Sequence, residues 1–195
     1  MKLMKSSIDA ILKNIDSAKD NLESEVIDEF LNTIIQSKNV FLIGAGRSGL
    51  AAKAFAMRLM HLGISVYVVG ETISPAINKE DCIIAISGSG ETSTIISAVK
   101  IAKERGSKVL SLTSYGESTL GKLSDTYILV KGRTKNDDSK NYLERQIHGK
   151  YHSLTPLGTL FELTSLIFLD GLISELMVRL GKTESDLKAR HTVLE

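Results

Sequence analysis

Five short apolar segments, separated by longer stretches of mixed composition, limit most strongly how this chain can fold. Each holds four or five residues that are nearly all apolar, whereas a strand buried on one face would alternate apolar and polar residues. Such strands, alternating with helices, are typical of a parallel sheet that helices cover on both faces. The sequence therefore predicts an α/β fold: a three-layer α-β-α sandwich around a doubly wound, five-stranded parallel sheet. The expected strands are residues 40–43, 66–69, 82–86, 109–112 and 127–130.

The chain is expected to form a single domain, because 195 residues suit one domain with a sizeable core. Residues 1–37 carry apolar positions at helical spacing in two successive segments, which predicts two amphipathic helices before the first strand. The α/β core then covers residues 38–180, and a helical tail covers residues 181–195. Within the core, residues 131–152 are mostly polar and predict a long surface excursion.

One of the expected helices is apolar almost all the way round. Thr155 is its expected N-cap and Pro156 its first residue, and it runs to about Leu180. The sheet of a single chain cannot easily cover every face of such a helix. The pattern therefore predicts a homo-oligomer.

Charge and cysteine content exclude several functions. The formal net charge is +1 and no local basic patch stands out, so we expect a small ligand rather than nucleic acid or an anionic membrane. Residues Met1–Lys5 lead into amphipathic sequence that contains acids, which predicts neither a signal peptide nor a membrane anchor and hence a cytoplasmic protein. The single cysteine, Cys82, lies in an apolar strand and is expected to be a reduced, buried thiol. We expect no disulfide framework and no cysteine-rich metal site.

The segment Val40–Gly49, VFLIGAGRSG, runs from a strand into a complete G-x-G-x-x-G motif. The motif is typical of dinucleotide-binding proteins, and Glu71, after the next apolar strand, stands about where a ribose-binding acid would. The glycines themselves indicate only that the backbone approaches something closely where a strand turns into a helix. Arg47, at a variable position of the motif, either reaches a phosphate or sugar oxygen or faces solvent.

A second glycine-bearing turn, SGSGETS at residues 87–93, follows another apolar strand and leads directly into a helix. Its glycines let backbone N–H groups converge, the helix N-terminus adds partial positive charge, and Ser87, Ser89 and Thr92 add hydroxyls. The turn predicts a phosphate cradle; a turn that only caps a helix is the alternative. It lacks the P-loop lysine, which disfavours a nucleoside triphosphate with Mg²⁺. Since both turns follow strands at one edge of the sheet, a phosphate monoester fits better than a dinucleotide.

Glu162 is the strongest candidate for a general base, because it is the only charged residue between Pro156 and Leu169. A carboxylate held partly out of water beside a sugar can remove a carbon-bound proton. The alternative is a surface glutamate that the macrodipole favours near a helix N-terminus.

Two histidines are candidates for a second catalytic group. Arg47, Arg58 and His61 share one face of an expected helix and form either a polar stripe beside a site or a solvated surface. His191, near the end of the chain, either reaches the site of an adjacent protomer or belongs to a frayed terminus. We expect His61 and His191 to assist in proton transfer or ring opening.

These motifs carry a resemblance to a known family. GAGRSG and SGSGET, each after a strand, resemble the sugar isomerase (SIS) domain, a phosphosugar-binding α/β fold of the flavodoxin-like or Rossmann-like kind. Together with AMRLMHLG, VGE, LTPLGTLFE and the terminal ARHTVLE, they make the chain from about Val40 to Glu195 resemble the 6-phospho-3-hexuloisomerases.

The resemblance implies an isomerisation of D-arabino-hex-3-ulose 6-phosphate to D-fructose 6-phosphate through an enediol, with no metal ion or other cofactor. Glu162 resembles the catalytic base of that family. The resemblance further implies the ribulose monophosphate pathway and formaldehyde assimilation, with 3-hexulose-6-phosphate synthase as functional partner, and a homotetramer. The substrate-binding residues are then Gly46, Arg47, Ser48, Ser87, Gly88, Ser89, Gly90, Glu91 and Thr92.

Other functions stay open at this point. SIS domains also serve as non-catalytic phosphosugar sensors in regulators, although residues 1–37 supply only two helices and no DNA-binding domain. Another phosphosugar isomerase is a further alternative. Because of the G-x-G-x-x-G motif, a dinucleotide-dependent dehydrogenase is a further alternative. The lack of a substrate domain and the presence of the second cradle argue against it.

Overall fold

The computed structural model of the chain describes residues 1–20, 22–132 and 158–193, and its centre is a five-stranded parallel sheet. The strands lie in the order β2-β1-β3-β4-β5, and each neighbouring pair is parallel. This confirms the predicted sheet, and no strand end differs from its predicted position by more than about one residue. The strands are β1 (Val40–Gly44), β2 (Val66–Val68), β3 (Cys82–Ile86), β4 (Lys108–Thr113) and β5 (Thr126–Leu129).

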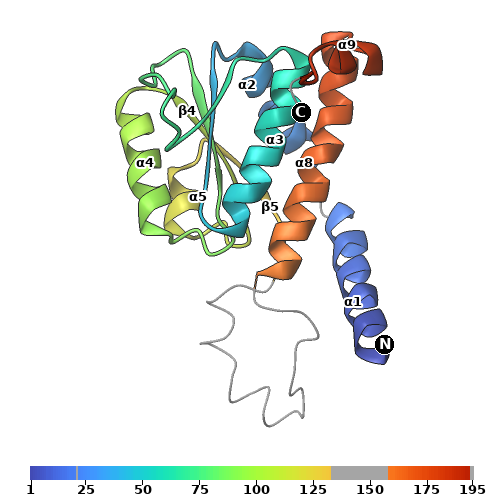
Figure 1. Cartoon of the computed structure of the whole chain (residues 1–195). Coiled ribbons are helices and arrows are strands. Elements are labelled where there is room, and N and C mark those ends of the chain that lie inside the picture. The colour runs from blue at the N-terminus through green and yellow to red at the C-terminus, as the bar shows by residue number, and fades with distance from the viewer. Residues whose placement is uncertain (21, 133–157, 194–195) are drawn as a thin grey trace.

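Helices cover both faces of the sheet, as the three-layer prediction requires (Figure 1). On one face lie α2 (Ser24–Gln36), α3 (Arg47–Leu62) and α8 (Thr159–Leu180). On the other face lie α4 (Ser93–Glu104) and α5 (Thr119–Leu123). Two further helices lie at the periphery: α1 (Lys2–Lys19) packs beside α8, and α9 (Glu184–Ala189) packs against α3.

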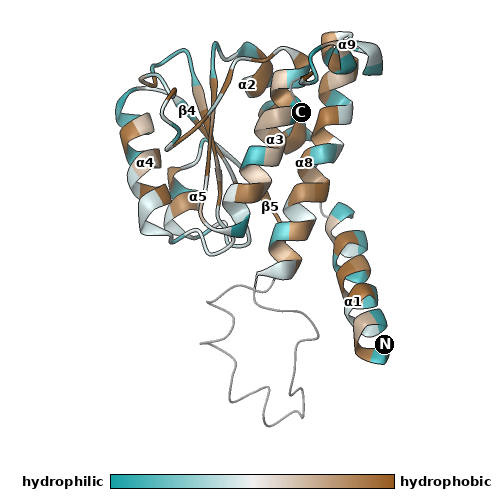
Figure 2. Cartoon of the chain, in the orientation of Figure 1, coloured by the Kyte–Doolittle hydropathy of each residue, from teal (hydrophilic) through white to brown (hydrophobic). Residues whose placement is uncertain are grey.

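The strands are apolar along their whole length because each face of the sheet packs into a separate hydrophobic core. Leu42 and its neighbours on the adjacent strands pack with Phe30 of α2, Phe55 of α3 and Leu176 of α8. Phe41, the preceding residue, points the other way into a smaller cluster under α4 and α5. Figure 2 shows the resulting brown strands through the middle of the molecule. Burial on both faces thus explains why polar residues are rare in these segments.

The long C-terminal helix begins later than the sequence pattern predicts. Gly158 is its N-cap and has a φ of 87°, outside the helical region, so α8 starts at Thr159. A helix that runs unbroken from Pro156 is therefore wrong, because the backbone changes direction at Gly158. Thr155, Pro156 and residues 133–152 of the predicted excursion lie outside the described residues.

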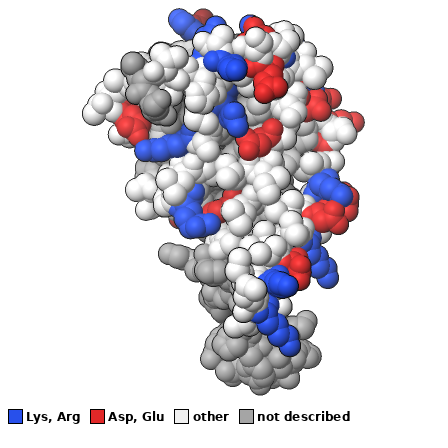
Figure 3. Space-filling view, turned by 45° about the vertical axis from the view of Figure 1, so that its right-hand side comes forward, with Lys and Arg blue, Asp and Glu red and all other residues white. Residues whose placement is uncertain are grey.

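The surface carries charges of both signs. Figure 3 shows Lys and Arg interspersed with Asp and Glu over the face it presents, without a large area of one sign. Within the described ranges, no helix combines the length and the hydropathy that crossing a membrane requires.

A substitution at Phe30 tests whether α2 is part of the larger hydrophobic core. Its side chain is fully buried among the apolar residues of the sheet, α3 and α8. Replacing it by alanine should lower the free energy of unfolding by about 3–5 kcal/mol, since the cavity adds to the lost transfer energy. Urea titration followed by circular dichroism measures the change. Ile101→Ala, at a side chain that is 55% exposed, should change it by less than about 0.5 kcal/mol.

Candidate active site

The strand order creates a crevice between the carboxyl ends of β1 and β3. These strands are direct neighbours, with Gly44 opposite Ile86 at their ends. After β1 the chain crosses one face through α3 to β2, and after β3 it crosses the other face through α4 to β4. Such a reversal of strand order leaves a ligand-binding crevice beyond the strand ends. The two glycine-bearing segments of the sequence both lie here, as the Gly44–Ser48 loop and the Ser87–Thr92 loop.

The Ser87–Thr92 loop folds into a compact turn lined with hydroxyls. The Ser87 Oγ and Thr92 Oγ1 atoms are 3.2 Å apart, and the backbone N–H of Gly90 lies 3.1 Å from the Ser87 carbonyl oxygen. Thr92 is the N-cap of α4, so the first N–H groups of that helix face the same space. Ser87 is buried, while Ser89 and Thr92 are half-buried. Hydroxyls and free helical N–H groups together can bind a phosphate group.

Gly90 holds the Ser87–Thr92 loop in shape. Its φ of 65° is strained for any residue with a side chain. A Cβ atom there would also lie 2.0 Å from the Oγ of Ser118, at the start of α5. The loop therefore depends on a neighbouring segment that approaches its backbone very closely.

The Gly44–Ser48 loop brings α3 unusually close to β1. A Cβ atom on Gly44 would lie 2.6 Å from the backbone oxygen of Ser48, so only glycine permits this approach. Gly46 is the N-cap of α3, and Arg47 and Ser48 begin the helix. The first N–H groups of α3 thus point into the crevice from the side opposite the Ser87–Thr92 loop.

Glu162 and Arg47 meet at this crevice. The Nε–H group of Arg47 donates a hydrogen bond to the Glu162 carboxylate, which joins the start of α8 to the start of α3. The Glu162 side chain is only 16% exposed, whereas that of Arg47 is 57% exposed. The predicted base and the predicted orienting cation are therefore brought together. A half-enclosed carboxylate beside a guanidinium can exchange a proton with a ligand whose developing negative charge the guanidinium stabilises.

The carboxylate of Glu91 is hydrogen-bonded to Thr119 of the same chain. Its two oxygens accept hydrogen bonds from the Thr119 backbone N–H (2.7 Å) and from the Thr119 hydroxyl (2.8 Å). The backbone hydrogen bond is the largest cause that lowers the pKa of Glu91, and the hydroxyl adds to it. The predicted substrate contact of Glu91 stays a prediction.

Glu71 also has a partner within the protein. Its Oε1 atom is 2.6 Å from the ammonium of Lys53 on α3, and this hydrogen bond lowers the pKa of Glu71. A ribose-binding acid accepts hydrogen bonds from the ribose hydroxyls, so a dinucleotide would have to compete with Lys53 for this carboxylate. The strand before it, β2, is also only three residues long.

His61 and His191 contact each other, but far from this crevice. Their rings are stacked with centroids 5.1 Å apart. His61 is buried near the end of α3, fourteen residues beyond Arg47, which is about 21 Å along the helix. Burial, the neighbouring His191 and Arg58 all lower the pKa of His61. The two histidines therefore do not reach Glu162 of their own chain. Arg58 lies between them and Arg47 and faces Asp170 of α8 at 4.0 Å.

Cys82 is buried as predicted, and burial raises its pKa to about 12. Among the residues that the structure describes, no three His, Cys, Asp or Glu side chains gather so as to hold a metal ion.

Two contacts at this edge were not predicted from the sequence. Thr119 anchors the carboxylate of Glu91, and Ser118 packs on the backbone of Gly90. Both residues lie at the start of α5, Ser118 as its N-cap and Thr119 as its first residue, nearly thirty residues after the loop they support. The one sequence signal for these contacts is the adjacent pair Ser118-Thr119, because such hydroxyl residues are typical at the start of a helix.

The fold and this edge define the class: a doubly wound α/β protein with a hydroxyl-lined crevice at the switch point of its sheet. The SIS domain family matches residues 33–136, and the chain belongs to that family. A 3-hexulose-6-phosphate isomerase of Bacillus subtilis is 37% identical over 95% of this chain and 95% of its own length.

Two other relatives cover nearly the whole chain. A protein of Methanothermobacter thermautotrophicus is 45% identical over 100% of this chain and 98% of its own length. A Methanococcus jannaschii crystal structure, described as inferring a 3-hexulose-6-phosphate isomerase function, has a TM-score of 0.81. It is 34% identical and the match covers 97% of this chain and 99% of that one.

The lowered pKa of Glu91 predicts a stability that depends on pH. Because the folded state lowers this pKa below its ordinary 4.5, the Thr119 contact stabilises the fold above that pH. The stabilisation is lost as the pH falls through the lower, folded-state pKa. Glu91→Gln should therefore lower the urea midpoint at pH 7, and the difference from the parent protein should shrink towards about pH 3.

A carboxylate in the same region serves as the control. Glu117→Gln, at a side chain that is 93% exposed, should give at most a small difference between the two pH values. If Glu91→Gln lowers the urea midpoint by the same amount at both pH values, the hydrogen bonds from Thr119 do not stabilise the charged form of Glu91.

Proposed function

We propose that this chain isomerises D-arabino-hex-3-ulose 6-phosphate to D-fructose 6-phosphate. The observation that carries the proposal is the half-enclosed Glu162 carboxylate, paired with Arg47, beside the hydroxyl-rich Ser87–Thr92 loop. The curated relatives named 3-hexulose-6-phosphate isomerase support the choice of this substrate. A phosphate group and a reacting carbonyl require two adjacent sites of different character, and the crevice offers both.

The phosphate binds at the Ser87–Thr92 loop. Ser87, Ser89 and Thr92 offer hydroxyls, and the N-terminus of α4 offers N–H groups with partial positive charge. The N-terminus of α3 at Ser48 adds donors from across the crevice. A phosphate monoester, with a charge between −1 and −2 near neutral pH, suits two such helix ends.

Glu162 then moves the proton between two carbons of the sugar. It removes the carbon-bound proton from C2, and the electrons of that bond form the C2–C3 double bond of an enediolate whose negative charge lies on the C3 oxygen. The hydroxyl proton on the C2 oxygen passes to the C3 oxygen. The same carboxyl then returns its proton to C3, and the C2 oxygen becomes the carbonyl of fructose 6-phosphate. Arg47, beside Glu162, stabilises the negative charge on the enediolate oxygens.

The histidines fit this scheme as groups from a neighbouring subunit. His61 and His191 lie about 21 Å from their own Arg47, so their proposed help in proton transfer or ring opening requires a second protomer. A homotetramer remains our proposed assembly. The apolar surface of α8 supports an oligomer, since Ile167 and Val178 are 49% and 80% exposed.

The reaction also suggests its metabolic context. Aldol addition of formaldehyde to ribulose 5-phosphate gives a hexulose 6-phosphate with its carbonyl at C3, so we propose 3-hexulose-6-phosphate synthase as the functional partner. The chain would then act in the ribulose monophosphate pathway, in formaldehyde assimilation and in the cytoplasm.

The direct test supplies ribulose 5-phosphate, formaldehyde and purified 3-hexulose-6-phosphate synthase, and measures fructose 6-phosphate. The parent chain should form it. Glu162→Gln should lower kcat about 10²- to 10⁴-fold, because the amide cannot take up a proton, while affinity for fructose 6-phosphate stays similar. Glu104→Gln, an exposed residue at the end of α4, should leave kcat unchanged.

Two results would contradict the proposal. No fructose 6-phosphate above the synthase-only control would exclude this substrate. A Glu162→Gln variant that turns over at the parent rate would exclude Glu162 as the base.

Isotope exchange tests the enediol step separately. In D₂O, the reaction mixture should accumulate deuterium on C2 of the substrate or C3 of the product, because the protonated Glu162 can exchange with solvent between removal and return. Proton NMR of the sugars measures this. Equilibration of the two sugars with no deuterium uptake at either carbon would point to a hydride shift instead.

A further inference from the structure

Gly158, the N-cap of α8, lies directly against the carboxylate of Glu162 in the first turn of that helix. The backbone N–H of Glu162 donates a hydrogen bond to the Gly158 carbonyl oxygen (3.0 Å), so the two residues are one helical turn apart. A Cβ atom on Gly158 would lie 2.9 Å from Oε1 of Glu162 and 3.4 Å from Oε2. The shorter separation is below the 3.0 Å at which one of two such atoms must move away. The carboxylate can therefore keep its place only because Gly158 has no side chain.

The two oxygens of the Glu162 carboxylate have different neighbours. Oε2 accepts the hydrogen bond from the Nε–H group of Arg47. Oε1 is the oxygen that lies nearer to Gly158. Because Arg47 takes Oε2, Oε1 is the oxygen left to exchange a proton with a ligand. A side chain at Gly158 would thus push on the oxygen that matters most for proton transfer.

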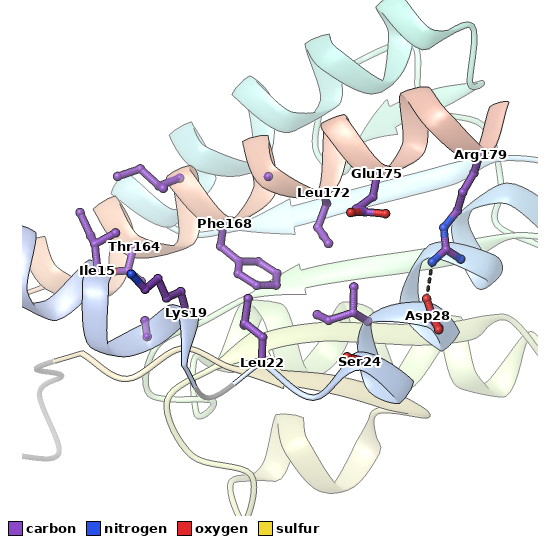
Figure 4. A pocket seen from close by; sticks show the side chains of 14 residues that line it. Ile15, Lys19, Leu22, Ser24, Asp28, Thr164, Phe168, Leu172, Glu175 and Arg179 are labelled. Carbon is purple, nitrogen blue, oxygen red and sulfur yellow. Dashed lines mark hydrogen bonds and ion pairs between the residues drawn. The ribbon is translucent and has the colours of Figure 1, made fainter. Parts of the chain in front are cut away.

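The first turns of α8 are held in place from another side. A Cβ atom on Gly132, just after β5, would lie 2.5 Å from the backbone nitrogen of Phe161, so the two backbones are in tight contact. Asn14 of α1 donates hydrogen bonds to the Thr164 hydroxyl (2.9 Å) and to the carbonyl oxygen that precedes Gly132 (3.2 Å). Figure 4 shows Thr164 at this junction of α8 with α1. Since the end of a long side chain moves more easily than a packed helix, a Cβ atom on Gly158 would displace the carboxylate.

We propose that Gly158 positions Glu162 for proton transfer. Its positive φ turns the chain into α8, and its missing side chain lets the carboxylate lie where Arg47 reaches Oε2. Gly158 acts through Glu162 and is a positioning residue. A base that is displaced even slightly from its substrate loses much of its effect, because proton transfer requires close and well-oriented atoms. The inference rests on the proposed function, since it needs Glu162 as the base.

Gly181, the C-cap of the same helix, provides a matched control. Its φ of 61° is also positive, but a Cβ atom there would meet nothing within 4 Å. Gly158→Ala and Gly181→Ala both bear the strain of a positive φ, so both should lower the urea midpoint to a similar extent. Only Gly158→Ala should lower kcat, at least about tenfold, with KM for fructose 6-phosphate changed less than about threefold. The formaldehyde that the synthase releases from the isomerised sugar measures both constants.

Two further readouts show whether Gly158 acts through the carboxylate. In the Glu162→Gln background, which lacks the base, Gly158→Ala should lower the residual rate less than about twofold. Losses that multiply would overturn the proposal, because Gly158 would then matter for another reason. The second readout needs no turnover. The NMR resonance of the Arg47 Nε–H group should shift in Gly158→Ala and stay in place in Gly181→Ala, since only the first substitution moves the acceptor of its hydrogen bond.

Equal kcat values for the two alanine variants, or an unmoved Arg47 resonance in Gly158→Ala, would overturn the proposal. If circular dichroism shows that Gly158→Ala is unfolded, Gly158→Asn replaces it, because asparagine tolerates a positive φ and carries the same Cβ atom. The same loss of kcat is then expected. A Glu162→Gln variant that turns over at the parent rate would overturn the proposed function and this inference together. If Glu162→Gln loses activity and folded Gly158→Ala does not, this inference alone is wrong.

Discussion

The parallel pairing of β1 with β3 determines where this protein can bind anything. Its register sets Gly44 opposite Ile86, so the loops that follow these residues open side by side. The crossovers from these two strands leave on opposite faces of the sheet, and therefore neither helix closes the space between the loops. The start of α3 and the start of α4 converge on that space. Any change in register would separate the two loops and with them the phosphate donors from the Arg47–Glu162 pair.

Close backbone packing turns this crevice into a defined site. Gly44 admits the backbone of α3 and Gly90 admits Ser118, in each case at a distance that a side chain would forbid. Glu91 then fastens its loop to Thr119 with both carboxylate oxygens. These contacts lie outside the crevice. Inside it, the Ser89 hydroxyl accepts a hydrogen bond from the Glu91 N–H, and the Thr92 hydroxyl faces that of Ser87. Preorganised donors of this kind bind and stabilise charge without having to reorient during a reaction.

The sequence predicts the sheet well because burial on both faces forces continuous apolar strands, a local pattern. The two loops were also predictable, since glycines, hydroxyls and a following helix lie within a few residues of one another. The pairing of Arg47 with Glu162 was not, because the partners are 115 residues apart and meet only when α8 packs on α3. The same holds for Glu91 with Thr119 and for the stacked histidines. Sequence patterns name candidate residues, but tertiary packing decides which of them share a site.

A phosphorylated sugar should bind at the carboxyl ends of β1 and β3. Amide NMR during titration with fructose 6-phosphate, with fructose as the comparison ligand, measures this binding residue by residue. With the phosphate ester, saturable shifts are expected at the backbone N–H groups of Arg47, Ser48 and Ser87–Thr92, and with fructose the shifts should be far weaker. Shifts confined to other regions, such as the surface between α1, α2 and α8, or equal shifts with both sugars, would exclude a phosphate site in this crevice.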